Sequence, residues 1–366
     1  MARLDQICRL NMGQSPDSSS YNENGEGMPF FQGNADFGKV HPRVRVWCSA
    51  PTKVAHAGDV LISVRAPIGA LNVADRECCI GRGLAALTVN EELCNKNYLW
   101  YAIASKVDEL NSKGTGSTFK AISKNVLAET EIPLPTMEKQ QSVAGQLGKV
   151  DELISLRKEQ LAKLDELVKA RFVEMFGDPV LNQKGYPCMT VDDVIEFQGG
   201  SQPDKSFFEY VPTEDNIRLI QIRDYKTDKY ITYIPKSKAK RFCTADDIMI
   251  GRYGPPIFQI LKGIEGSFNV ALMKATPRKG NREFVRHFLM QDCLLEYLEG
   301  LSKRTAGQDG IQMDKLKAYP FPYPPMELQE QFAAFANEVE KSKLTIQASL
   351  DKLEVMKKAL MQEYFG

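Results

Sequence analysis

Residues 138–177 of this chain read EKQQSVAGQLGKVDELISLRKEQLAKLDELVKARFVEMFG, and this stretch decides the fold. Its apolar residues recur at steps of mostly three or four, which is typical of one face of an amphipathic helix and close to a coiled-coil repeat. No proline interrupts it, so we expect one helix of roughly 38 residues, or about 57 Å at 1.5 Å per residue. The sequence Gly177-Asp178-Pro179 is expected to end the helix, because glycine and proline favour a helix stop.

A second copy of this stretch occupies residues 327–366, ELQEQFAAFANEVEKSKLTIQASLDKLEVMKKALMQEYFG. Both copies follow a proline-rich segment and both end in Phe-Gly. Pro133 corresponds to Pro322 and Gly177 to Gly366, each displaced by 189 residues. Two unrelated helices would not share their start, length and end, so we interpret the pattern as an internal duplication. The predicted seam of the two helices comprises Val150, Ile154, Leu161, Leu164, Val168, Ile346, Leu350 and Leu353.

The two blocks that precede these helices share one plan. Residues 58–69 contain a turn, an apolar β-rich run and a Pro/Gly stop, and the same pattern recurs at residues 247–255. The sequence also predicts a helix at residues 98–110 and a matching helix at residues 284–298. Between such anchors the blocks differ, so that Arg65 corresponds to Tyr253.

The predicted fold class is α+β, with two mixed α/β domains separated by two long antiparallel coiled-coil helices and a pseudo-two-fold internal repeat. The predicted boundaries are 1–136 for the first domain, 137–177 for the central helix, 178–324 for the second domain and 325–366 for the C-terminal helix. A duplicated frame with divergent faces suggests one task performed on two different targets.

Composition restricts the class of protein. The 366 residues include 47 basic and 47 acidic side chains, a balance that neither requires nor excludes nucleic acid. Eight cysteines occur without a CxxC pair, which favours reduced thiols over disulfides or a zinc site. No signal peptide and no apolar run near 18 residues occurs, so we expect a soluble, cytoplasmic protein without membrane contact.

Motifs for catalysis are missing from the sequence. None of the three histidines has the spacing of an HExxH metal site, and there is no GxxxxGK(S/T) phosphate loop or GxSxG nucleophile elbow. The Asn/Asp-Pro-Pro-aromatic motif of DNA adenine methyltransferases is absent as well. We therefore predict no catalytic residues, no metal site and no activity of the chain by itself.

The sequence resembles the specificity subunit of type I restriction–modification enzymes over essentially its whole length. The resemblance rests on the duplicated Pro-rich segment with its Met-Glu-x-Gln start, on the two Phe-Gly helix ends, on the strand at residues 58–69 and on the loop at residues 116–123. Residues 254–258, GPPIF, depart from it, because the family more often has Gly-x-Ile-Gly there.

This resemblance implies that each domain is a target-recognition domain that reads one half of a gapped site in double-stranded DNA. It implies that the helices act as a spacer and dock two methyltransferase subunits, and that restriction/translocase subunits join the full enzyme. The chain would then have no cofactor of its own. S-adenosylmethionine, ATP and Mg would belong to the partner subunits.

Direct readout of DNA favours Arg, Lys, Asn and Gln side chains at base edges, while phosphate contacts set the register. On this ground the predicted DNA-binding residues of the first domain are Lys39, Arg43, Arg45, Arg65 and Lys120. Those of the second domain are Arg223, Lys240, Arg241, Arg252, Tyr253, Arg304 and Gln308. For each of them the alternative interpretation is an ordinary solvated surface side chain.

Two alternative functions compete with DNA recognition. A coiled-coil scaffold would use the domains to bind proteins, and it predicts no sequence-dependent binding to any duplex. A self-contained DNA-modifying enzyme would have to bind S-adenosylmethionine by itself, which calorimetry on the isolated chain would detect.

Overall fold

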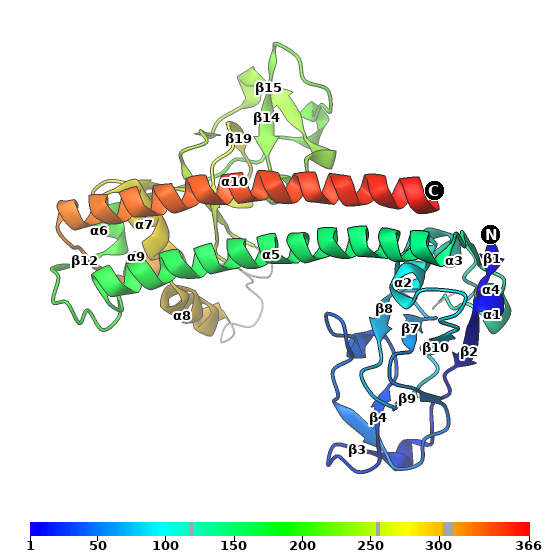
Figure 1. Ribbon diagram of the computed structural model, residues 1–366. Coiled ribbons are helices and arrows are strands. Elements are labelled where there is room, and N and C mark those ends of the chain that lie inside the picture. The colour runs from blue at the N-terminus through cyan, green and yellow to red at the C-terminus, as the bar shows by residue number, and fades with distance from the viewer. Residues whose placement is uncertain (117–119, 254–256, 303–310) are drawn as a thin grey trace. The chain divides into compact units, whose positions relative to one another are not determined.

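The computed structural model describes residues 1–116, 120–253, 257–302 and 311–366, and it divides into two compact units (Figure 1). The first unit comprises Met1–Lys158 and Gln347–Gly366, and the second comprises Glu159–Ile346. Each unit therefore contains one of the two sequence blocks together with part of both long helices.

Both long helices are continuous and equal in length. Helix α5 spans Met137–Phe176 and α10 spans Met326–Phe365, 40 residues each. Each begins directly after the proline-rich segment and ends directly before a glycine. Gly177 adopts a φ of 75°, the left-handed conformation that glycine accepts most readily at a helix end. The two predicted helices are thus confirmed, two residues longer than expected.

Within each unit the two helices run antiparallel. In the first unit Lys357 Nζ lies 2.6 Å from Asp151 Oδ1, and the Tyr364 hydroxyl donates to Gln146 Oε1 at 3.1 Å. Residue numbers on α10 rise as those of the contacting residues on α5 fall, so the two helices are antiparallel. In the second unit the same order appears in the ion pair of Lys343 with Asp165 and in the contact of Phe332 with Phe172, whose ring centroids are 5.3 Å apart.

The seam residues differ in burial. Val150, Val168 and Leu350 are buried, with 3%, 7% and 5% of their surface exposed. The other members are only half-buried, because a contact between two helices alone covers one side of each: Ile154, Leu161, Leu164, Ile346 and Leu353.

The block of the first unit contains two sheets and a short ribbon. One sheet is antiparallel and has the order β2 (Cys8–Met12), β10 (Leu84–Val89), β7 (Val60–Ser63), β8 (Leu71–Val73). The other has the order β3 (Tyr21–Asn22), β5 (Val46–Cys48), β4 (Met28–Phe31), β9 (Cys78–Ile80), β6 (Val54–Ala55), in which β4 and β9 are parallel. The ribbon pairs β1 (Ala2–Arg3) with β11 (Glu131–Ile132). Its helices are α1 (Leu4–Ile7), α2 (Lys96–Ser105), α3 (Val107–Ser112) and α4 (Lys124–Ala128).

The block of the second unit repeats this topology, except that an isolated bridge between Glu209 and Tyr233 stands where β3 pairs with β5 in the first unit. Its antiparallel sheet has the order β13 (Ile195–Gly199), β20 (Leu272–Pro277), β17 (Ile248–Gly251), β18 (Gln259–Lys262). Its second sheet has the order β15 (Tyr233–Pro235), β14 (Asn216–Ile220), β19 (Gly266–Phe268), β16 (Phe242–Cys243), again with one parallel pair, β14 with β19. Its ribbon pairs β12 (Cys188–Thr190) with β21 (Pro320–Pro322). Its helices are α6 (Val191–Val194), α7 (Arg282–Leu289), α8 (Asp292–Ser302) and α9 (Met313–Lys317). The predicted fold class and the internal repeat are confirmed.

The helices expected at residues 98–110 and 284–298 are each divided in two. In the first unit the Ser105 hydroxyl donates to Ala102 O at 2.8 Å, and the N–H of Lys106 bonds to Ile103 O instead. In the second unit the Gln291 side chain donates to His287 O at 2.8 Å. A side chain that occupies a helical carbonyl competes with the next turn. The result is a break between α2 and α3 and another between α7 and α8.

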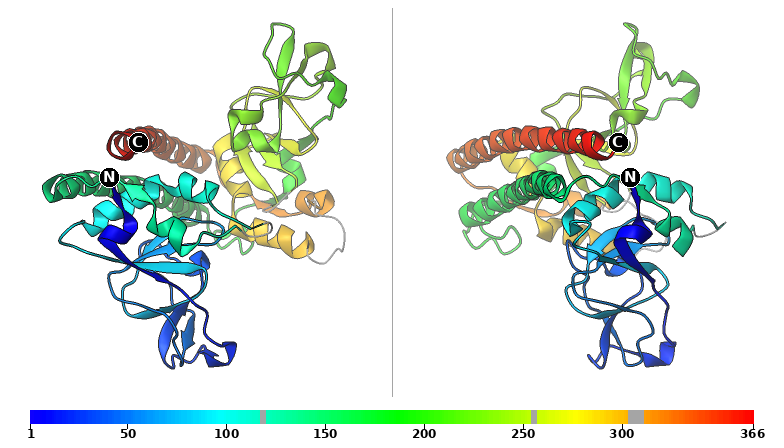
Figure 2. Two further views of the ribbon diagram at one scale, coloured as in Figure 1. Left: turned by 90° about the vertical axis from the view of Figure 1, so that its right-hand side faces the viewer. Right: turned by 45° about the vertical axis from the view of Figure 1, so that its right-hand side comes forward.

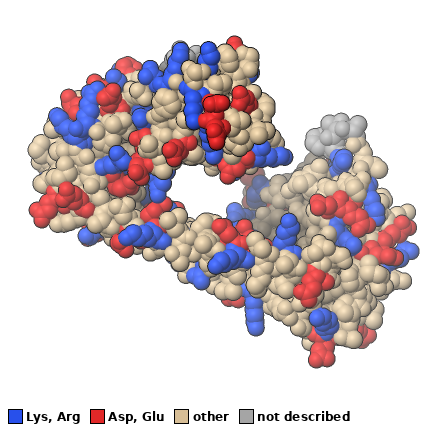
Figure 3. Space-filling view, turned by 90° about the horizontal axis from the view of Figure 1, so that it is seen from above, with Lys and Arg blue, Asp and Glu red and all other residues tan. Residues whose placement is uncertain are grey.

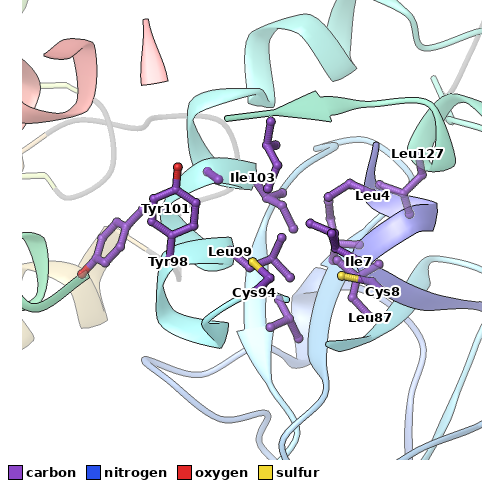
Figure 4. Packing of buried hydrophobic residues seen from close by; sticks show 14 of the residues in the cluster. Leu4, Ile7, Cys8, Leu87, Cys94, Tyr98, Leu99, Tyr101, Ile103 and Leu127 are labelled. Carbon is purple, nitrogen blue, oxygen red and sulfur yellow. The ribbon is translucent and has the colours of Figure 1, made fainter. Parts of the chain in front are cut away.

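Aromatic residues at the Phe-Gly ends attach the long helices to the blocks. In the first unit α2 lies alongside α5 (Figure 2), and the ring of Phe365 lies 5.2 Å from that of Tyr98 on α2. In the second unit Phe176 lies 4.7 Å from Phe284 on α7. Tyr98 belongs to a core that also contains Leu4 of α1 and other side chains of α1, β10 and α2 (Figure 4). Each Phe-Gly end is therefore an anchor of its own unit.

The Gln of the Met-Glu-x-Gln start has a structural role in both units. Gln140 accepts the N–H of Asn95 at 2.8 Å and donates to Pro135 O at 2.9 Å. Gln329 accepts the N–H of Asn281 at 2.8 Å and donates to Pro324 O, also at 2.8 Å. Both side chains are buried. Each joins the start of a long helix to the residue that caps α2 or α7.

Replacing Gln140 with alanine is expected to destabilise the first unit by about 1–3 kcal/mol, because it leaves a buried N–H and carbonyls unsatisfied. Both tryptophans, Trp47 and Trp100, belong to the first unit, so tryptophan fluorescence in urea measures this loss. Gln141→Ala, at the exposed neighbouring position, is the control. Equal effects of the two substitutions would contradict the structural role of Gln140.

None of the described helices combines the length and the apolarity that a membrane span requires.

Candidate nucleic-acid interface

Charges of both signs are interspersed over the protein surface that Figure 3 shows. Lys and Arg side chains lie beside Asp and Glu side chains, as the formal net charge of zero suggests. A surface of this kind offers local sites to DNA rather than one broad basic face. The candidate sites are therefore found in the loops of each block.

A groove of about 630 Å³ in the first unit collects three arginines, Arg45, Arg65 and Arg82. We call it the arginine groove. Its other polar residues include Ser15, Gln32, Asn34 and two acidic residues, Glu23 and Asp36. The three guanidinium groups exceed the two carboxylates, so the groove carries one net positive charge.

The sheet topology explains why these residues meet. Strands β4 and β9 are parallel, so the residues that follow them leave the sheet at the same end of the strands. Strand β5 is antiparallel to β4 and begins at that end, which places Arg45 there. The N–H of Val64, after β7, donates to Gly83 O at 2.9 Å and brings Arg65 to the loop of Arg82.

A buried carboxylate organises the groove. Asp36, with 9% of its surface exposed, accepts the N–H of Gln32 at 2.7 Å and forms an ion pair with the Arg45 guanidinium. Charge-assisted bonds of this kind hold a side chain in one geometry. Arg82 has a weaker contact, from Nε to Ser15 Oγ at 3.4 Å. Arg65 has no ion pair among the residues that the structure describes.

The second unit has a related carboxylate at the corresponding strand end. Asp224 is buried, accepts the N–H of Gln221 at 3.2 Å and lies 3.7 Å from Arg218 Nε. Burial raises the pKa of Asp224 above its ordinary value, although Arg218 and Arg223 act in the opposite direction. A buried carboxylate beside an arginine thus follows the parallel strand in both units, although the arginine comes from the start of β5 in the first unit and from β14 in the second.

Arg223 lines a groove of about 450 Å³, together with three tyrosines. We call it the tyrosine groove, and its aromatic and basic residues are Tyr210, Arg223, Lys229, Tyr230 and Tyr233. The guanidinium of Arg223 lies 5.8 Å and the ammonium of Lys229 lies 5.2 Å from the ring centroid of Tyr230. Cation–π contact holds both charges at the surface of the groove.

Two of the predicted DNA-binding residues of the first unit, Arg45 and Arg65, line the arginine groove. Arg43 and Lys120 are exposed and do not line it. The structure places these residues without testing contact with DNA, so their role stays a prediction.

Lys39 points elsewhere, because its Nζ donates to Ser155 Oγ on α5. Three residues of the arginine groove, Gln32, Asn34 and Arg82, are missing from the sequence-based prediction. The signal that could reveal Arg82 is its position between two glycines directly after β9. A Cβ on Gly83 would lie 2.4 Å from Gln32 O, so only glycine allows this close approach.

In the second unit only Arg223 among the predicted residues lines the tyrosine groove, within the described part of the chain. Arg252 is half-buried, with its guanidinium 5.4 Å from the Tyr253 ring. Lys240 and Arg241 are exposed on the segment before β16. Two more predicted residues lie outside the described residues: Arg304 and Gln308.

A cavity of about 510 Å³ in the second unit contains His287, between side chains of α5, α7, α10 and β18. The imidazole contacts the Phe332 ring, with centroids 5.2 Å apart. Burial, assisted by the charge of Arg286, lowers the pKa of His287 from 6.5 to about 4. His287 is thus neutral in the folded protein near neutral pH. In the described residues no group of three His, Cys, Asp or Glu side chains could hold a metal ion.

The second unit is expected to lose stability as the pH falls from about 6.5 to about 4. In that range the unfolded chain binds a proton at His287 that the folded chain does not bind, so protonation favours unfolding. Urea midpoints from circular dichroism at pH about 5 and about 7 measure the loss. His287→Gln should reduce the difference between the two midpoints. An unchanged difference in His287→Gln would contradict the assignment.

Comparison with known proteins yields one family across most of the chain. The family model described as "Type I restriction modification DNA specificity domain" matches residues 1–166 and 183–355. The "Putative type I restriction enzyme MjaX specificity subunit" of Methanocaldococcus jannaschii is 40% identical over 161 residues, which are 44% of this chain and 38% of that protein. The MjaVIII specificity subunit of the same organism is 21% identical over 310 residues, which are 76% of this chain and 71% of that protein.

A solved structure has the same fold. The crystal structure of the type I restriction–modification system S subunit from M. genitalium has a TM-score of 0.62 and covers 100% of this chain and 95% of that chain. Its sequence identity of 16% supports similarity of fold alone. The chain spans only 38% and 48% of the length of two of the curated relatives that it matches.

Proposed function

The chain belongs to the family of type I restriction modification DNA specificity domains, and on this premise we propose that it is a DNA sequence-recognition subunit. Each unit would read one half of a gapped site in double-stranded DNA. The single observation that carries the proposal is the arginine–carboxylate arrangement beside the parallel strand pair in both units. A repeated frame that presents different side chains suits two readers of different sequences.

The chemistry of the two grooves supports contact with DNA. Arginine binds guanine edges and phosphates through its fork of N–H donors, and Gln and Asn bind adenine edges. The arginine groove offers Arg65, Arg82, Gln32 and Asn34. The tyrosine groove offers Arg223 and Lys229 beside the ring of Tyr230. Such a set suits direct readout together with phosphate contacts.

We further propose that the chain is not catalytic by itself and that partner subunits contribute the chemistry. Two methyltransferase subunits and restriction/translocase subunits would bring S-adenosylmethionine, ATP and Mg. Exposed apolar side chains on the long helices support docking of proteins there, because they remain uncovered in this chain. They include Leu153, Leu156, Leu167, Val173, Leu344, Val355 and Met356.

We also propose a cytoplasmic location, which the cysteines support. All eight are free, and six of them are buried. Burial raises the pKa of the Cys8 and Cys78 thiols to about 12, so both stay protonated at neutral pH. Unpaired thiols of this kind suit a reducing compartment.

Methylation mapping of the native host tests the proposed function. The expected result is a bipartite methylated motif, two short specific halves around a fixed gap, that disappears when the gene for this chain is deleted and returns with the full chain. An unchanged set of methylated motifs after deletion would refute the proposal. It would favour the scaffold alternative if the chain still recovers protein partners from cells.

Calorimetry with S-adenosylmethionine on the isolated chain distinguishes a DNA-recognition subunit from a self-contained DNA-modifying enzyme. We expect no heat of binding from the chain alone. Binding by the chain without partners would instead favour a self-contained DNA-modifying enzyme.

A further inference from the structure

We propose that the first unit reads guanine in its half of the DNA site through Arg65 and Arg82, and that the second unit has no guanine reader at the matching positions. This inference rests on the proposed function, because it requires that the chain binds DNA. It goes further by assigning a base to one unit and naming the side chains that select it.

Hydrogen bonds define which residues correspond in the two units. The N–H of Val64 donates to Gly83 O at 2.9 Å, and the N–H of Arg252 donates to Ala271 O at 2.9 Å. Both pairs are displaced by 188 residues. The residue after Val64 is Arg65, and the residue after Arg252 is Tyr253.

The same correspondence holds for the neighbouring loop. Arg82 directly precedes Gly83, and Val270 directly precedes Ala271. The parallel pairing agrees, since Phe31 lies opposite Ile80 in the first unit and Ile220 lies opposite Phe268 in the second. Two arginines of the arginine groove are therefore replaced by a tyrosine and a valine.

The donors of Arg65 and Arg82 are open to a ligand. Within the described residues neither has an ion pair, and the hydrogen bond of the Arg82 side chain is the long one to Ser15. Both side chains belong to exposed residues that line the groove. Arg45 differs, because Asp36 already binds its guanidinium. We therefore assign base contact to Arg65 and Arg82, and a positioning role to Arg45.

Guanine is the base that such donors select. Its O6 and N7 atoms are two adjacent acceptors in the major groove, and they match two N–H groups of one guanidinium. Tyrosine offers a single hydroxyl and valine offers no donor, so Tyr253 and Val270 cannot reproduce this pairing. The adjacent Arg252 is directed at protein instead, with its guanidinium over the Tyr253 ring and Nη1 3.5 Å from Val270 O.

Selection from a randomised DNA duplex library tests the inference. The native complex is captured through a tag on the full chain, the bound duplexes are sequenced, and relative affinities are measured by competition. We expect a bipartite motif with at least one G·C pair in one half. Arg65→Gln and Arg82→Gln should each reduce the preference for a G·C pair in that half by about tenfold to a hundredfold.

A matched variant tests that the first unit reads the G·C half. Tyr253→Phe, at the position of the second unit that corresponds to Arg65, should leave the preference for the G·C pair unchanged, and a loss of that preference would contradict the assignment to the first unit. Retained selection of the other half in Arg65→Gln and Arg82→Gln shows that both variants are folded and that the complex is intact.

Three outcomes would overturn the inference. A bipartite motif without a G·C pair in the half sensitive to Arg65 and Arg82 would refute it while leaving the proposed function intact. Uniform weakening of all sequences, with a smaller dependence of affinity on salt, would show that the arginines contact phosphates. Absence of any selected motif with the wild-type complex would refute the proposed function as well.

Discussion

Replacing Val168 with aspartate is expected to destabilise the second unit by about 3 kcal/mol, because it places a charge among the buried apolar side chains between α5 and α10. Val168 has 7% of its surface exposed and belongs to one apolar cluster with Phe172, Ala336 and Val339. The cluster joins α5 to α10, so the substitution should separate the two helices in this unit.

The neighbouring position provides the control for this substitution. Leu167 is 47% exposed, so Leu167→Asp introduces the same charge into solvent and should change stability by about 0.5 kcal/mol or less. Hydrogen exchange of amides in α7 reports the second unit, whereas tryptophan fluorescence reports the first. Equal effects of the two substitutions would refute the assignment of Val168 to the buried seam.

Replacing Phe172 with alanine is expected to cost the second unit about 3–5 kcal/mol, because the vacated volume cannot be refilled by a close-packed aromatic cluster. The Phe172 ring stacks on Phe284 at 5.5 Å and lies 4.9 Å from Phe176 and 5.3 Å from Phe332. It thus connects α5 to α7 and to α10 within one unit.

The control for this prediction is Phe242→Ala, at a position that is 50% exposed in the same unit. It removes the same atoms without opening a buried cavity, and a loss below about 1 kcal/mol is expected. Urea denaturation followed by hydrogen exchange of α7 amides measures both variants. A loss in Phe172→Ala as small as in Phe242→Ala would show that the cluster does not hold this unit together.

The long helices were predictable because their signal is local and repeated. Apolar residues spaced three or four positions apart can be recognised without knowledge of distant contacts. Over 40 residues this spacing predicts a helix more strongly than any competing pattern. The breaks after Ser105 and Met290 were not predictable in the same way. They depend on single side-chain bonds to Ala102 O and His287 O, which the apolar period does not contain.

The candidate site was predictable in part. Arg45 and Arg65 stand next to strand-like segments, and both line the arginine groove. Lys39 has the same residue chemistry nearby, yet it bonds to Ser155 on α5. Arg82 is remote in sequence from Arg45, and only the parallel pairing of β4 with β9 brings their loops to the same end of the strands.

The sequence by itself determined the duplication, the two long helices and the mixed α/β blocks, because periodicity and repeated segments are properties of the chain order. The tertiary structure alone decided which side chains share a groove, how Gln140 and Gln329 join the helices to the caps of α2 and α7, and which seam residues are buried. These features depend on pairings between strands of two to six residues that lie far apart in the chain. Such contacts follow from packing of the whole unit, which no local pattern encodes.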